Sequence, residues 1–305
     1  MRWMFNRVKV GTKRPGRPRT AVEIAPEGVV AASLPVQGRT LLYALEPLGP
    51  GVVVPGIVEQ NLRPPELVVE AICSTLKRAA QGSRVVTLIL PDAAVRVFVL
   101  DFDTLPAKEA DLIAVLRFRL RKMVSFDVER AGITYQILSQ PVSGCRVLVT
   151  ILPGAILEEY ESAVRKAGYE PGFVLPSSMA ALHGLDSPEP VLAAFLSGSS
   201  FTTSITNGQD LLLYRRVDLP DDQNLRVDEL KRDVAVAMAY FEDNLKGPPQ
   251  RLHYAGIEGA RAFSCWIKEP HLPVLDLAPL PETSATIGPV NASIAGVTGA
   301  LAGAE

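Results

Sequence analysis

The stretch VLAAFLSGSSFTTSITNGQDLLLYRR, residues 191–216, consists of three apolar runs that are separated by turn residues. Asn207 and Gly208 form a dipeptide that is typical of a two-residue hairpin turn. The stretch therefore predicts a β-meander. Its three predicted strands cover residues 191–196, 201–206 and 211–217.

A helix and a strand are predicted to follow this meander. The apolar stripe of the helix, over 228–245, recurs at helical spacing. It consists of Leu230, Val234, Ala237, Phe241 and Leu245. A short apolar run over 252–255 predicts one further strand. The second half of the chain thus has the order β-β-β-α-β.

The first half of the chain shows the same order without similarity of individual residues. Its three strand-like runs cover residues 20–24, 29–34 and 41–45. Pro64 and Pro65 come next, and proline suits the first turn of a helix. That helix ends at Gly82, and a continuous apolar run over 85–90 is typical of a buried central strand. The pattern β-β-β-α-β therefore occurs twice.

A unit of different texture separates the two copies. Residues 91–152 predict a strand, a helix that begins at Pro106, and two further strands, which together make a small β-α-β-β unit. The helix, over 106–124, carries arginine and lysine on one side. The predicted division is a basic flexible arm at 1–19, a first lobe at 20–90, the inserted unit at 91–152, a return and crossover at 153–189, and a second lobe with a C-terminal helix at 190–305.

Composition narrows the class of protein. The chain has 305 residues, of which 48% are hydrophobic, and this suits about two domains with sizeable cores. A net charge of −2 argues against binding a polyanion through overall charge. Three scattered cysteines are too few for a disulfide framework or a tetrahedral zinc site. No apolar run is long enough to span a membrane and no signal peptide is visible, so we expect a reducing, cytoplasmic setting.

The double pattern is the layout of actin-like ATPases, and several stretches resemble one branch of them. Residues 86–138 (VTLILPDAAVRVFVLDFDTLPAKEADLIAVLRFRLRKMVSFDVERAGITYQIL), residues 191–216 and residues 228–260 (DELKRDVAVAMAYFEDNLKGPPQRLHYAGIEGA) resemble PilM-type type IV pilus assembly proteins. RTAVEIAPEGVVAASL, residues 19–34, stands where those proteins have their first phosphate hairpin. The resemblance implies an α/β actin-like fold with two RNase H-like lobes and the small insertion. The cytoplasmic part of GspL proteins of type II secretion is similar in pattern.

The resemblance also implies a nucleotide cleft, from which this sequence departs. Members of the superfamily place carboxylates near Mg²⁺ and glycines near phosphates. Here Glu23 keeps a carboxylate, Pro26 stands in the glycine region, and Ala194 stands where an aspartate is expected. The resemblance leaves five candidate nucleotide-cleft residues: Glu23, Gly198, Ser199, Ser200 and Gly256. No catalytic residue or metal ligand is predicted, which favours a pseudo-ATPase without a cofactor.

Three functional hypotheses follow. The first is a cytoplasmic scaffold that binds the N-terminal tail of a PilN-like inner-membrane protein, in a groove between the first lobe and the inserted unit. It would link the assembly platform to the pilus motor proteins and reach the membrane through its partners. The second is an active or nucleotide-switched ATPase of pilus or type II secretion assembly, in which Glu23 orients Mg²⁺ of Mg-ATP and Gly198–Ser200 hold phosphate.

The third hypothesis is a nucleic-acid-binding protein that uses the basic arm. KRPGRPR, residues 13–19, resembles the core of an AT-hook, which places arginines in the minor groove. One imperfect copy on a chain of net charge −2 argues against it. We therefore expect no nucleic-acid partner.

Overall fold

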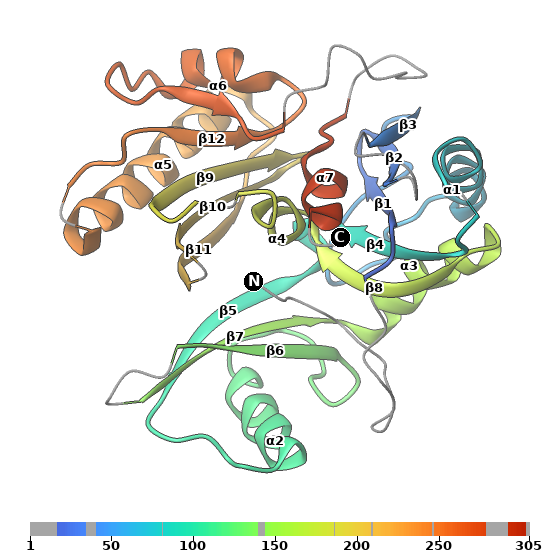
Figure 1. Ribbon diagram of the computed structural model, residues 1–305, viewed down its shortest axis with the longest axis horizontal. Helices are drawn as coiled ribbons and strands as arrows, with labels where there is room; N and C mark the ends of the chain where they lie inside the picture. The colour runs from blue at the N-terminus through green and yellow to red at the C-terminus, as the bar shows by residue number, and fades with distance from the viewer. Residues whose placement is uncertain are drawn as a thin grey trace.

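The computed structural model describes residues 17–34, 41–80, 82–139, 144–185, 187–208, 210–245, 247–278 and 292–302. Within these ranges the strands form three sheets, one in each of two lobes and one in a smaller unit (Figure 1). This arrangement confirms the predicted fold class. The predicted basic arm lies, for residues 1–16, outside the described part of the chain.

The first lobe is built on a mixed sheet with strand order β3-β2-β1-β4-β8. Its strands are β1 (Thr20–Ala25), β2 (Gly28–Ser33), β3 (Leu42–Pro47), β4 (Val85–Leu90) and β8 (Glu170–Pro176). The first three are antiparallel neighbours, whereas β4 runs parallel to both β1 and β8. Helices α1 (Pro65–Ala79) and α3 (Gly154–Lys166) share one hydrophobic core with this sheet. The apolar stripe of α1 faces that core, as its period requires.

The second lobe repeats this plan with strand order β11-β10-β9-β12-β13. Its elements are β9 (Pro190–Ser197), β10 (Ser200–Asn207), β11 (Asp210–Asp218), α5 (Gln223–Leu245), β12 (Leu252–Ala255), α6 (Gly259–Ile267) and β13 (Val274–Asp276). Helix α5 begins at Gln223, before the predicted start at Asp228. The reason is an N-cap, because Asp222 accepts hydrogen bonds from the backbone N–H groups of Asn224 and Leu225 at 2.9 and 3.0 Å.

The inserted unit is an antiparallel sheet with one covering helix. A short 3-10 turn, η1 (Asp92–Ala94), leads into β5 (Arg96–Phe102), α2 (Glu109–Leu120), β6 (Gly132–Ser139) and β7 (Cys145–Leu152). The strand order is β5-β7-β6. One face of the sheet packs on α2 through Leu112, Leu116 and Leu120. The opposite face turns toward the two lobes.

The C-terminal helix α7 (Ala295–Leu301) follows the second lobe in sequence, and the predicted division groups it with that lobe. In the structure it packs against β1, β2 and β4 of the first lobe and against α4 (Ser177–Leu182). Glycine permits this approach: a Cβ on Gly299 would lie 2.1 Å from the carbonyl oxygen of Ala180. Residues 279–291, which precede this helix, lie outside the described part of the chain.

Candidate functional site

Segments of both lobes meet in the cleft between them. The first lobe contributes β1, the β1–β2 turn, η1 and α4, and the second contributes the end of β9 and the end of β12. The start of α7 completes the lining. The cavity enclosed there measures about 30 Å³. Pockets for small ligands usually measure roughly 300–1,000 Å³, so this one has room for water rather than for a nucleotide.

Glu23 of β1 lines this cleft. Its side chain is 5% exposed, and Oε1 accepts a hydrogen bond from the Ser177 hydroxyl. Oε2 is buried and has no hydrogen-bond partner within the described ranges. Burial raises the pKa of Glu23 to about 7, the Ser177 hydrogen bond opposes the rise, and the charges of Asp92 and Glu27 add to it. The carboxyl group is therefore about half protonated at neutral pH.

Asp92 connects the lobes and was missed by sequence reasoning. Its carboxylate accepts hydrogen bonds from the backbone N–H and the hydroxyl of Ser178, at 3.1 and 2.9 Å, and from the hydroxyl of Thr202 in the second lobe, at 3.1 Å. Burial raises the pKa of Asp92, and these three hydrogen bonds oppose the rise. The Tyr214 hydroxyl lies 2.9 Å from that of Ser178 and adds a second connection. The available signal was an acid directly after a buried strand.

The predicted phosphate turn, Gly198–Ser200, faces the first lobe at close range. The backbone N–H of Gly198 donates to Glu27 Oε1 at 2.8 Å, and the Ser197 hydroxyl lies 3.5 Å from Glu27 Oε2. A Cβ on Gly198 would lie 3.0 Å from the Pro26 ring. The carboxylate of Glu27 thus stands where the sequence analysis expects a phosphate.

The remaining candidate residues are not gathered at one point. The Ser200 hydroxyl accepts a hydrogen bond from Arg216 at 3.2 Å, and the Ser199 carbonyl accepts one from the backbone N–H of Leu219 at 2.7 Å. Gly256 follows β12 and is crowded by the Tyr254 hydroxyl, which would lie 2.1 Å from a Cβ at that position. Ala255 and Ile257, on either side of Gly256, line the cleft instead. Glu23 lines the cleft and Gly198 contacts Glu27 across it, whereas Ser199 and Ser200 make contacts within the second lobe and Gly256 lies against Tyr254.

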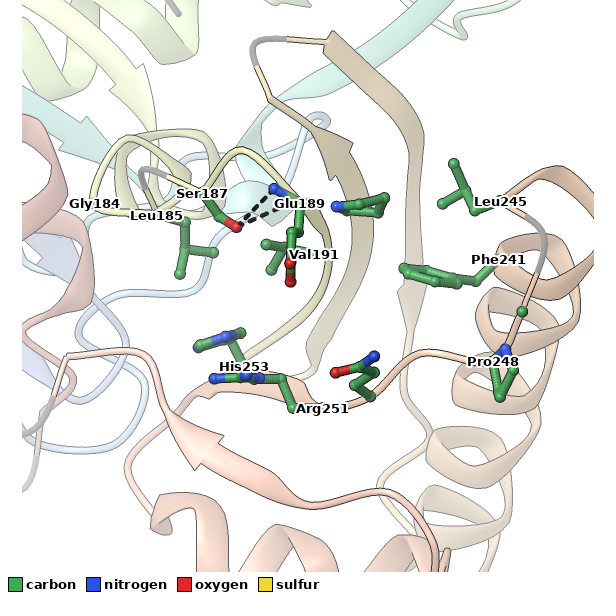
Figure 2. Close-up of a pocket in the computed structure, with 13 residues that line it drawn as sticks. Gly184, Leu185, Ser187, Glu189, Val191, Phe241, Leu245, Pro248, Arg251 and His253 are labelled. Carbon is green, nitrogen blue, oxygen red and sulfur yellow. Dashed lines mark hydrogen bonds between the residues drawn. The ribbon is translucent and has the colours of Figure 1, made fainter.

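A larger pocket of about 620 Å³ opens at the other end of β9 (Figure 2). Val191, at the start of that strand, lines this pocket, whereas Ser197, at its end, lines the cleft. Phe241 and Leu245 of α5 give this pocket an apolar wall, and Arg251, which directly precedes β12, lines its opposite side. None of the five candidate nucleotide-cleft residues lines this pocket.

The face of the inserted sheet that turns toward the lobes is apolar. Val97 and Val99 of β5 and Leu138 of β6 are half-buried there, and they pack against the core cluster that includes Leu148 of β7 and the β11 side chain Leu211. Gln136, two residues before Leu138, shares this face because side chains alternate along a strand. Its Oε1 is buried and has no partner in the part of the chain that the structure describes. The face thus combines apolar side chains with an unused hydrogen-bond acceptor.

No group of three or more His, Cys, Asp and Glu side chains in the described ranges is placed to hold a metal ion. Across the same ranges, no helix combines the length and the apolar character that crossing a bilayer requires.

Comparison with known proteins places the fold. No family model matches the chain, and no curated protein matches it in sequence. A solved PilM-PilN type IV pilus biogenesis complex is similar in structure, with 17% identity, a TM-score of 0.75, and coverage of 95% of this chain and 100% of that one. The cytoplasmic domain of EpsL, an inner-membrane component of the Vibrio cholerae type II secretion system, gives 16% identity and a TM-score of 0.51, with coverage of 92% and 93%.

A Bacteroides thetaiotaomicron protein with an actin-like ATPase fold and unknown function gives 10% identity and a TM-score of 0.52. Coverage is 93% of this chain and 94% of that one. Identities this low speak for shared architecture and not for shared activity. The two lobes with repeated strand order, the inserted unit and these likenesses together show that the chain has the actin-like ATPase fold.

Proposed function

We propose that the chain is a scaffold of type IV pilus assembly that binds the N-terminal tail of a PilN-like inner-membrane protein. The observation that carries the proposal is the apolar face of the inserted sheet, formed by Val97, Val99, Leu138 and Gln136. The likeness to a PilM-PilN complex supports it. The scaffold works on the cytoplasmic side of the inner membrane and connects the assembly platform to the motor proteins.

The chemistry of this face suits an extended apolar segment. Alternate side chains of an extended peptide can pack on Val97, Val99 and Leu138, which supply apolar contact area. Gln136 Oε1 is buried without a partner among the described residues, at a cost of about 1–3 kcal/mol, and a backbone N–H of a peptide that displaces the packing over it can donate to it. The tail of a membrane protein is a suitable occupant because its own span supplies the membrane attachment.

Tail binding can be measured by fluorescence anisotropy. A labelled peptide of the cytoplasmic tail of the PilN-like protein from the same organism is expected to bind with micromolar Kd, about −8 kcal/mol. Leu138→Asp should weaken binding at least about tenfold, since it buries a carboxylate in the apolar face, and Gln136→Ala should weaken it by a smaller factor. Phe118→Asp is the matched control, because Phe118 lies on α2 and is 69% exposed. No anisotropy change with the unaltered chain, or equal losses in all three variants, would count against the proposal.

The cleft supports a scaffold without a nucleotide. A magnesium ligand must be deprotonated, and burial raises the pKa of Glu23 to about 7, so ionising this carboxyl group at neutral pH costs more free energy than ionising an exposed glutamate. The turn expected to bind phosphate contacts Glu27, and the cavity is smaller than any nucleoside triphosphate. The residues present therefore fit Mg-ATP poorly, and no chemical step is assigned to it.

A thermal melt tests this part of the proposal. Millimolar Mg-ATP or Mg-ADP is expected to leave the unfolding midpoint within about 1 °C of the ligand-free value. A ligand present at 100 times its Kd would add about 2.7 kcal/mol, or roughly 5 °C for a chain of this size. A rise of that order would favour the nucleotide-switched alternative. Magnesium chloride with inorganic sulfate at equal ionic strength is the control for general salt effects.

A further inference from the structure

The contact between Glu27 and the β9–β10 turn crosses the cleft between the lobes. Glu27 belongs to the β1–β2 turn of the first lobe, and Ser197 and Gly198 belong to the second. We infer that Glu27 is an internal ligand whose carboxylate occupies the N–H donor of this turn and holds the lobes closed without any bound molecule. We call this contact the Glu27 latch.

The geometry of the latch is that of an anion site. A backbone N–H that donates to a carboxylate at 2.8 Å forms a charge-assisted hydrogen bond, which is stronger than a bond between neutral groups. Gly198 has φ of +55°, a conformation that glycine adopts without strain and that directs its N–H across the cleft. Arg226 of α5 donates to the Gly198 carbonyl oxygen, so a positive charge lies at the same turn. The second lobe therefore offers an anion both a donor and a favourable field.

Packing around the latch leaves no space for a competing anion. The Pro26 ring lies against the Gly198 backbone, where a Cβ would approach it to 3.0 Å. The neighbouring cavity of about 30 Å³ is too small for a phosphate group together with its hydration. An external anion can reach the turn only after Glu27 has left it. The same chain thus supplies both the anion-binding N–H of Gly198 and the carboxylate of Glu27 that occupies it.

The latch acts together with two other contacts between the lobes. Asp92 accepts from Thr202, and the Ser178 and Tyr214 hydroxyls are hydrogen-bonded. Tyr214 lies on β11, which also carries Leu211 of the core cluster behind the inserted sheet. Closure of the lobes therefore fixes the position of β11 relative to the apolar face proposed for the tail. The latch itself does not require that a tail binds.

Hydrogen exchange of the full chain tests the latch. Glu27→Ala should raise amide exchange of the segment 196–202 by about tenfold or more, because Gly198 loses its acceptor and the lobes separate more often. Glu46→Ala is the matched control. Glu46 also accepts hydrogen bonds through its carboxylate, from Ser74 and Arg78, but all three residues lie in the first lobe. This control should leave exchange at 196–202 unchanged.

Rescue by a small carboxylate separates the latch from a general loss of packing. Acetate should restore protection of 196–202 in Glu27→Ala, whereas chloride at equal ionic strength should not. Glu27→Gln, which keeps an acceptor oxygen and loses the charge, should show intermediate exchange. Unchanged exchange in Glu27→Ala, an equal rise in Glu46→Ala, or the absence of acetate rescue would each overturn the inference. Tail binding is measured separately, so either proposal can fail without the other.

Discussion

Replacing Glu23 with glutamine is expected to stabilise the fold by about 3 kcal/mol at pH 8 and to change it little near pH 4. The pKa of Glu23 is about 7 in the fold and 4.5 without its environment. Between these values the folded chain holds a proton that the unfolded chain has released. The part of the stability that depends on protonated Glu23 is therefore fully present below pH 4.5 and is lost as the pH rises through 7. A difference of about 2.5 between the two pKa values corresponds to about 3 kcal/mol of stability.

Glutamine retains the shape of the side chain but cannot ionise, so the variant should not show this loss. Denaturant melts between pH 4 and pH 9 measure this loss as the difference in unfolding free energy between Glu23→Gln and the unaltered chain. The contributions of the other titrating groups cancel in that difference. Glu59→Gln is the control, because the Glu59 side chain is 75% exposed and loses only a surface ion pair with Arg63, so this substitution should change stability little. A difference between Glu23→Gln and the unaltered chain that stays constant with pH would show that Glu23 does not titrate in this window.

The fold was predictable because its signals are local. Hairpin chemistry at Asn207-Gly208 and the 3.6-residue stripe of α5 each decide an element without reference to distant residues. The packing partner of α7 could not be predicted for the opposite reason. Its apolar composition indicates burial, but burial alone does not say against which lobe the helix packs. That choice depends on the fit of Gly299 against the α4 backbone, which no periodicity reveals.

The candidate site likewise contains residues that the sequence indicates and residues that only the folded chain reveals. Glu23 and Gly198 could be named as candidates because the resemblance to actin-like proteins places them in two hairpins. Glu27 and Asp92 were missed because their partners are remote in sequence: 171 residues separate Glu27 from Gly198, and 110 separate Asp92 from Thr202. A carboxylate in a turn is ordinarily a solvated turn former, and only the folded chain shows it facing a donor.

Substituting Gly299 with alanine is expected to destabilise the fold by about 3 kcal/mol, the upper end for overpacking. The added Cβ would meet the carbonyl oxygens of Ala180 and Ala181 at 2.1 and 2.8 Å. Both atoms belong to the backbone of α4 and cannot rotate away as a side chain does. Either α4 or α7 must shift. Denaturant melts measure the cost, and Gly49→Ala, whose Cβ would approach no neighbour closer than 4.0 Å, should stay within about 0.5 kcal/mol of the unaltered chain.

The same substitution should also weaken the pH dependence that Glu23 produces. Gly296 of α7 covers the unpartnered oxygen of Glu23, since a Cβ there would lie 2.3 Å from Oε2. A displaced α7 admits water to this carboxyl group, and hydration lowers a pKa that burial had raised. The stability of Gly299→Ala should therefore fall less between pH 4.5 and pH 7 than that of the unaltered chain. An equal fall in both chains would mean that α7 does not control the burial of Glu23, and that the cost of the added methyl group is confined to the contact with α4.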